Sequence, residues 1–136
     1  MNALVLDASM ALEWFFPSPD VRESSDALAK RELANDAPLV VPHIWRFEIL
    51  NFLSRQRRLG KLSEGESVAI ATDLLALPLA IVDEGDPATV LALAADQSLT
   101  AYDASYLSAA LQGNWALLTF DRNLGMAAER MGVTLA

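Results

Sequence analysis

The sequence "NALVLDASMALEWFF", residues 2–16, places a short apolar strand directly before a helix, with an aspartate at the junction. Residues 2–6 are rich in branched apolar side chains, which is typical of a buried strand. Residues 8–16 carry apolar side chains at helical spacing, and Pro17 ends the helix because proline lacks the backbone N–H that a helix interior needs. This segment therefore predicts a strand that leads straight into a helix.

The alternation of strand and helix continues along the chain. Further strands are expected at residues 38–42, 79–83, 115–119 and 133–135. The helices between them are expected to begin at Ser18-Pro19, His43, Ser63, Asp86-Pro87, Thr100 and Asp121, with Ser63 and Glu66 forming a capping box. Such alternation predicts an α/β fold with a short, mainly parallel sheet that is covered by helices on both faces. We expect residues 1–136 to form one domain.

Composition narrows the classes of function. The chain of 136 residues has no cysteine and one histidine, which excludes disulfides, a thiolate nucleophile, a Cys-based zinc site and a His-rich metal site. The net charge of −8 argues against a nucleic-acid binder that is held by bulk positive charge. No signal peptide or membrane-spanning segment is visible, so we expect a cytoplasmic protein that does not associate with a membrane.

One dense positive run, "RQRRLGK" at residues 55–61, has two interpretations. Arg55, Arg57 and Arg58 fall at the end of a predicted helix that Gly60 closes, where cations suit the negative end of the helix dipole. The same three arginines are candidate contacts to substrate phosphate. The first interpretation is slightly favoured.

Three aspartates fall where α/β proteins bind ligands. Asp7 follows the first strand, Asp121 follows the strand at 115–119, and Asp103 lies in the first turn of a helix. Strand carboxyl ends and helix N-termini share one edge of such a sheet, and ligands bind there. Aspartate is also a preferred capping and first-turn residue, and Thr100 with Asp103 matches a capping box. Taken singly, each aspartate is better explained as a cap than as a catalyst.

Glu48 changes this balance. Apolar side chains cover most of the circumference of the helix predicted from His43, while Glu48, Asn51 and Arg55 form one narrow polar stripe. Capping does not explain a glutamate at this place, although a solvent-facing stripe would. A stripe that faces a cleft together with three aspartates makes a coherent site.

Four converging carboxylates would repel one another in the absence of a cation. Oxygen ligands without histidine or cysteine suit a hard divalent ion, Mg²⁺ or its substitute Mn²⁺. Such an ion also binds phosphate oxygens, and so converts an acidic pocket into a phosphate receptor. We therefore expect metal-assisted phosphoryl hydrolysis, with a set of four residues as metal ligands and catalytic residues: Asp7, Glu48, Asp103 and Asp121.

Four blocks of sequence, in order, resemble those of one protein family. They are "LVLDASMALEWFFPS" with Asp7 and Ser9, "PHIWRFEILNFLSR" with Glu48 and Asn51, "LTAYDASYLSAAL" with Asp103, and "ALLTFDRNL" with Asp121. Nearly end to end, the chain is similar to PIN-domain ribonucleases, and specifically to the VapC-like toxins of bacterial type II toxin–antitoxin pairs.

The resemblance implies a three-layer α/β/α fold and endonucleolytic cleavage of RNA that depends on Mg²⁺ or Mn²⁺. It also implies a homodimer and inhibition by a cognate antitoxin whose C-terminal segment occupies the toxin's groove. Ser9 and Asn51 would support the four acidic residues. Some relatives carry a further acidic residue where this chain has Asn123. Asn123 would offer a neutral oxygen or a water contact instead. The sequence therefore leaves open whether the site binds one metal ion or two.

Other functions fit the sequence less well. A receiver domain or a phosphatase of the haloacid dehalogenase type also has an aspartate after its first strand, but it needs a lysine near a late strand end, and neither Lys30 nor Lys61 follows one. Asp7-Ala8-Ser9 also lacks the second aspartate of the phosphatase motif. The alternative from another class is a catalytically silent partner-binding module of the same fold, against which the four acidic positions count.

The aromatic residues are more numerous on two predicted helices than a small core requires. They form either a dimer interface or part of the core, two interpretations with equal support from the sequence. The residues concerned are Trp14, Phe15, Phe16, Trp45 and Phe47.

Overall fold

The computed structural model describes residues 2–17 and 19–136 of the chain. Within these ranges the strands are β1 (Leu4–Leu6), β2 (Leu39–Pro42), β3 (Leu79–Val82) and β4 (Ala116–Leu118). The helices are α1 (Ala8–Phe15), α2 (Val21–Asn35), α3 (Ile44–Arg58), α4 (Glu64–Leu75), α5 (Pro87–Gln97), α6 (Ala101–Gly113) and α7 (Arg122–Arg130).

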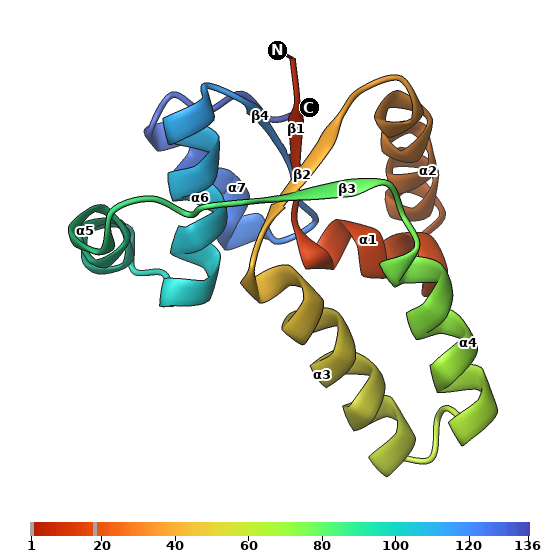
Figure 1. Ribbon diagram of the computed structural model, residues 1–136. Helices are drawn as coiled ribbons and strands as arrows, with labels where there is room; N and C mark the ends of the chain where they lie inside the picture. The colour runs from red at the N-terminus through yellow and green to blue at the C-terminus, as the bar shows by residue number, and fades with distance from the viewer. Residues whose placement is uncertain (1, 18) are drawn as a thin grey trace.

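The sheet has the strand order β3-β2-β1-β4, and every pair of neighbours in it is parallel. Helix α6 packs on β1, β2 and β4, with α5 and α7 beside it, while α1 and α2 lie together on the other side of the sheet (Figure 1). Helices α3 and α4 pair with each other and extend away from the sheet. The structure therefore confirms the predicted α/β/α layers and parallel sheet. None of the described helices is both long and apolar enough to cross a membrane.

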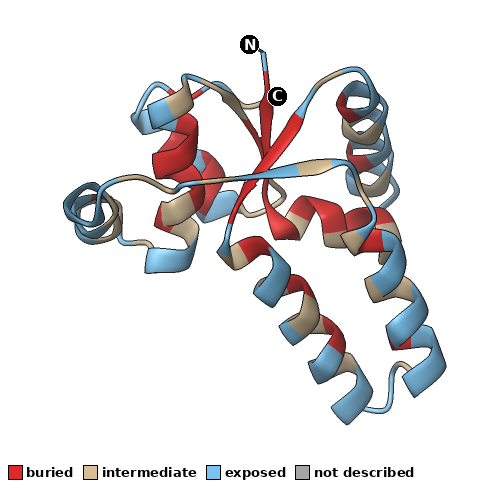
Figure 2. Cartoon of the chain, viewed as in Figure 1, coloured by how far each residue is buried: buried red, intermediate tan, exposed pale blue. Residues whose placement is uncertain are grey.

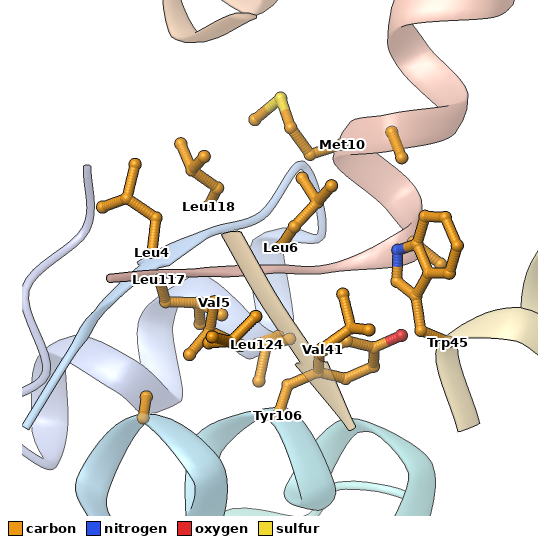
Figure 3. Close-up of a cluster of buried hydrophobic side chains, with 14 of the residues drawn as sticks. Leu4, Val5, Leu6, Met10, Val41, Trp45, Tyr106, Leu117, Leu118 and Leu124 are labelled. Carbon is orange, nitrogen blue, oxygen red and sulfur yellow. The ribbon is translucent and has the colours of Figure 1, made fainter. Parts of the chain in front are cut away.

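The core lies around β1, whose three residues are all buried. Figure 2 shows that burial is concentrated in the central strands and in the sides of α1 and α6 that face them. In the close-up of the core, Val5 and Leu117 lie between the strands and Tyr106 of α6 (Figure 3). Strand β3, at the edge of the sheet, is more open, and Ile81 is 63% exposed. The carboxyl ends of β1, β2 and β4 are therefore the enclosed part of the sheet's edge.

One predicted helix start and one predicted strand are wrong. Helix α2 begins at Val21 with Asp20 as its N-cap, whose carboxylate accepts from the backbone N–H of Glu23 at 3.0 Å. The predicted cap, Ser18, lies outside the described residues. The segment 133–135 forms a single bridge between Leu135 and Leu117 instead of a strand, because the Val133 N–H is bonded to the Ala128 carbonyl of α7.

Most of the aromatic residues belong to the core. Trp14 and Trp45 are buried, and Phe15 and Phe16 are partly buried and pack against the core. Phe47 differs, since 64% of it is exposed on α3. The core interpretation therefore holds for four of these residues and does not account for Phe47.

Candidate active site

The predicted carboxylates come from four elements that meet at the carboxyl edge of the sheet. Asp7 joins β1 to α1, and its backbone N–H donates to the Leu118 carbonyl of β4 at 2.9 Å. Asp121 is the N-cap of α7, just after β4, and Asp103 lies in the first turn of α6. Glu48 lies in the second turn of α3, whose first residue follows β2 closely. Parallel strands place all these junctions on one side of the sheet.

Asp7 is buried, with only 3% of its surface exposed. The Ser9 hydroxyl donates to its Oδ2 at 2.6 Å, and the Thr119 hydroxyl donates to the same oxygen at 2.7 Å. Burial raises the pKa of Asp7 to about 6; the two hydroxyl bonds lower that pKa, while Asp103 and Asp121 raise it. The carboxylate is thus held by neutral donors at a place where its charge is costly.

The hydroxyls of Ser9 and Thr119 also receive hydrogen bonds from the loop that carries Asp121. The backbone N–H of Phe120 donates to Ser9 Oγ at 2.9 Å, and that of Asp121 donates to Thr119 Oγ1 at 3.0 Å. Asp121 Oδ1 in turn accepts from the N–H of Leu124 at 3.0 Å and caps α7. One connected set of hydrogen bonds therefore places Asp121 relative to Asp7.

Glu48 is half-buried and accepts a hydrogen bond from a tyrosine. The Tyr106 hydroxyl donates to Glu48 Oε1 at 2.6 Å. Burial raises the pKa of Glu48 to about 7; the Tyr106 bond lowers that pKa, and Asp7, Asp103 and Asp121 raise it. Burial, together with the charges of Asp7 and Glu48, also raises the pKa of Tyr106, so its phenol stays protonated and remains a donor.

Asp103 is half-buried in the first turn of α6. Its backbone N–H donates to Thr100 Oγ1 at 3.1 Å, which is one half of the predicted capping box. In the described part of the chain both halves of such a box occur at Ser63 and Glu66, but not here. Burial raises the pKa of Asp103, Asp121 raises it further, and a hydrogen bond with the Thr100 side chain lowers it. Asp103 therefore does not complete a capping box, although its carboxylate lies in the first turn beside the Thr100 side chain.

Each of the four carboxylates repels the other three, because every pair among them contributes to a raised pKa. The oxygen-only donor set fits a hard divalent cation. Among the described residues, however, no three acidic or histidine side chains lie close enough together to form a ready-made metal site. Mg²⁺ commonly binds through one or two carboxylates and keeps several waters, so the open arrangement suits it. The full four-ligand set remains a prediction.

The predicted supporting residues are placed differently from one another. Ser9 belongs to the hydrogen-bonded set around Asp7. Asn51 is exposed on α3 and lines the same groove as Glu48. Asn123 is exposed at the second position of α7, and no hydrogen bond of its side chain occurs among those of the described residues.

The three arginines lie at the far end of α3. Arg55, Arg57 and Arg58 are exposed in its last turn, and Arg58 donates to Ser54 Oγ at 3.2 Å. From Glu48 to Arg58 the helix advances about 15 Å. The structure therefore does not bring Arg58 beside the carboxylates, and phosphate contact by these arginines remains a prediction.

Two residues of the site are not among those predicted from the sequence. Thr119 ends the predicted strand 115–119, and its signal is the place two residues before Asp121. Tyr106 follows Asp103 by three residues, so it lies on the same side of α6. Both are hydroxyl donors to a carboxylate, a role that neither composition nor spacing displays.

A model of the PIN domain matches residues 4–129. The chain belongs to the PIN domain family. This membership confirms the family resemblance of the four sequence blocks. No curated protein sequence matches the chain significantly.

Solved structures share the fold. PAE2754 from Pyrobaculum aerophilum is 23% identical with a TM-score of 0.71, covering 93% of this chain and 79% of that one. VapBC2 from Rickettsia felis, bound to a DNA fragment from their promoter, is 15% identical with a TM-score of 0.61, covering 98% and 97%. The Mycobacterium tuberculosis VapC20 structure, a sarcin-ricin loop cleaving toxin, is 17% identical with a TM-score of 0.60, covering 91% and 94%. At these identities the likeness establishes the fold alone.

The raised carboxylate pKa values predict how the stability of this PIN domain depends on pH. Asp7 and Glu48 hold a proton more tightly when folded, with pKa values of about 6 and 7 against 3.8 and 4.5 ordinarily. The folded state therefore binds more protons across this range, and stability should fall as pH rises through it. Thermal melting in EDTA should give a lower melting temperature at pH ~8 than at pH ~5.

Two variants test this dependence of stability on pH, one at the site and one as a control. Asp7→Asn should reduce this loss of stability with rising pH, whereas Asn in place of the exposed Asp73 should leave it unchanged. A melting temperature of the wild type that is constant or rises across this range would contradict the prediction.

Proposed function

We propose that this protein is a metal-dependent endoribonuclease that acts as the toxin of a toxin–antitoxin pair. The observation that carries the proposal is the gathering of four mutually repelling carboxylates at the carboxyl edge of the sheet in a PIN domain. The proposal includes a homodimer, supported by the exposed apolar Leu59 and Val68 at the α3–α4 pair, since homodimer interfaces are more apolar than the rest of the surface. It also includes a location in the cytoplasm, where RNA is available.

Asp7, Glu48, Asp103 and Asp121 would hold the cation, Mg²⁺ or Mn²⁺. When bound, it would supply the Lewis acid for attack of water on a phosphodiester and for departure of the leaving oxygen. The protein's part is to keep the carboxylates ionised and correctly turned. Ser9 and Thr119 do so for Asp7 by engaging a single oxygen, Oδ2.

A groove beside Glu48 fits the proposed substrate. It has a volume of about 630 Å³ and lies between α3 and the start of α6, lined by Ile44, Phe47, Glu48, Leu50, Asn51 and Tyr102. Phe47 is 64% exposed and Tyr102 is 59% exposed, so both rings are available to stack on unpaired bases. Stacking requires no positive charge, which suits a protein with a net charge of −8. The structural likeness to VapC20, a sarcin-ricin loop cleaving toxin, agrees with an RNA substrate.

Cleavage of RNA should require a divalent metal. We expect the purified protein to cleave RNA with Mg²⁺ or Mn²⁺, to lose this activity in excess EDTA, and to regain it when metal is returned, because the donor set suits only a hard cation. Asp7→Asn, purified in the same way, should be inactive and controls for a contaminating nuclease. Full activity in EDTA would contradict the mechanism, and absence of any cleavage with metal would favour the catalytically silent partner-binding module.

Asp103→Asn should separate metal binding from helix stabilisation. The change relieves repulsion among the carboxylates, so the melting temperature without metal should stay level or rise. Stabilisation by added Mg²⁺ should shrink, and RNA cleavage should fall by orders of magnitude.

The control is Glu64→Gln, which removes a first-turn carboxylate from α4. It should cost at most about 1 kcal/mol of stability and leave cleavage intact. If Asp103→Asn instead melts earlier without metal and cleaves RNA at the wild-type rate, Asp103 serves only its helix.

The antitoxin is expected to present arginine or lysine to the acidic groove. Complementary charges of this kind set the association rate and specificity. Co-expression with the product of the neighbouring open reading frame should give a complex that cleaves RNA slowly, and its rate of formation should fall as salt increases. A neighbouring product that neither binds nor inhibits, beside a toxin that is harmless on expression, would contradict the toxin–antitoxin assignment.

A further inference from the structure

The floor of the candidate site contains a buried tyrosine. Tyr106 lies in the middle of α6 and has no exposed surface. Figure 3 shows its ring beneath the central strands, with the hydroxyl pointing toward Trp45 at the start of α3. That hydroxyl donates to Glu48 Oε1 at 2.6 Å, which is the length of a charge-assisted bond to a carboxylate. The bond links α6 to α3 across the site.

Packing explains the ring of Tyr106 but not its hydroxyl. Phenylalanine would fill nearly the same space, and burying a hydroxyl is costly unless it is hydrogen-bonded. The bond to Glu48 offsets that cost, together with a hydrogen bond that the hydroxyl accepts from the backbone of Ala8. Helix α3 buries only Trp45, Ile49 and Leu53, so Glu48 lies at the side of the buried stripe rather than within it. Its flexible side chain would therefore be free to turn toward solvent without a donor.

The repulsion among the carboxylates would also turn Glu48 toward solvent. Asp7, Asp103 and Asp121 all raise the pKa of Glu48, which means that they push its charge away. A cationic partner would hold Glu48 in place, but it would also cancel the charge that attracts a metal. A neutral phenol avoids this conflict, as the neutral hydroxyls of Ser9 and Thr119 do at Asp7.

We infer that Tyr106 is a positioning residue: its hydroxyl holds the Glu48 carboxylate among the other three, binding Oε1 and leaving Oε2 available to a divalent cation. The inference rests on the proposed function, because it concerns the same metal site. It extends the site into the core of the sheet, through a residue that does not itself touch metal or RNA.

The test is Tyr106→Phe, measured by Mn²⁺ binding in the absence of RNA and by RNA cleavage. The dissociation constant for Mn²⁺ should rise about tenfold or more, as it does when a group that orients a metal ligand is lost. Cleavage should recover in part at high Mn²⁺ concentration, because the ligands themselves remain. The matched control is Ser108→Ala, which removes another buried hydroxyl of α6 whose bond goes to the Glu84 carbonyl. It should bind Mn²⁺ as the wild type does.

A second comparison separates positioning from a general effect on the fold. If Tyr106 acts through Glu48, Tyr106→Phe should have no further effect on Mn²⁺ affinity in a Glu48→Gln background. Equal losses in both backgrounds would overturn the inference. So would wild-type Mn²⁺ affinity in Tyr106→Phe, or failure of that variant to fold, since the hydroxyl would then serve the fold. A wild-type protein that binds no Mn²⁺ would instead overturn the proposed metal-dependent function.

Discussion

The burial of one carboxylate, that of Asp7, organises the carboxyl edge of the sheet. A charged group in this position is costly unless donors surround it, and the hydroxyls of Ser9 and Thr119 meet that requirement. The same hydroxyls accept from the backbone of the loop after β4, so β1, α1, β4 and α7 are joined through a single side chain. Removing either donor would therefore disturb both the charge and the loop that carries Asp121.

The topology of the sheet explains why three other carboxylates lie near Asp7. Chain order runs outward from β1 to β2 and β3 on one side, while β4 is added on the other. The crevice of a parallel sheet opens where the order reverses in this way. Asp7 and Asp121 flank that point, and α3 and α6 bring Glu48 and Asp103 to it. Residues more than 100 positions apart thus share one electrostatic field.

Much of this arrangement can be predicted from local sequence. The run 2–16 shows a strand and a helix with Asp7 between them, and the polar stripe of α3 singles out Glu48. The parts that cannot be predicted depend on contacts between distant segments. Nothing near Thr119 or Tyr106 in the sequence shows that its hydroxyl donates a hydrogen bond to a carboxylate of another element, since threonine suits any strand and tyrosine any core.

The errors have local physical causes. Ser18-Pro19 and Asp20 offer competing N-terminal signals within three residues, and the carboxylate at Asp20 caps the helix. Residues 133–135 have the composition of a strand, but the Val133 N–H is bonded to the Ala128 carbonyl of α7, and the segment pairs with β4 at Leu117 alone.

The projecting α3–α4 pair has a dynamic consequence. Its outer turns are largely exposed (Figure 2) and are held chiefly by the pairing of the two helices. Regions with few buried contacts open at a lower free energy than the core, so native-state hydrogen exchange would divide α3 into a slow inner half and a fast outer half. Glu48 belongs to the inner half, bonded to the core through Tyr106. The outer turns of α3 and α4 can therefore unfold locally and refold while the carboxylates keep their places relative to one another.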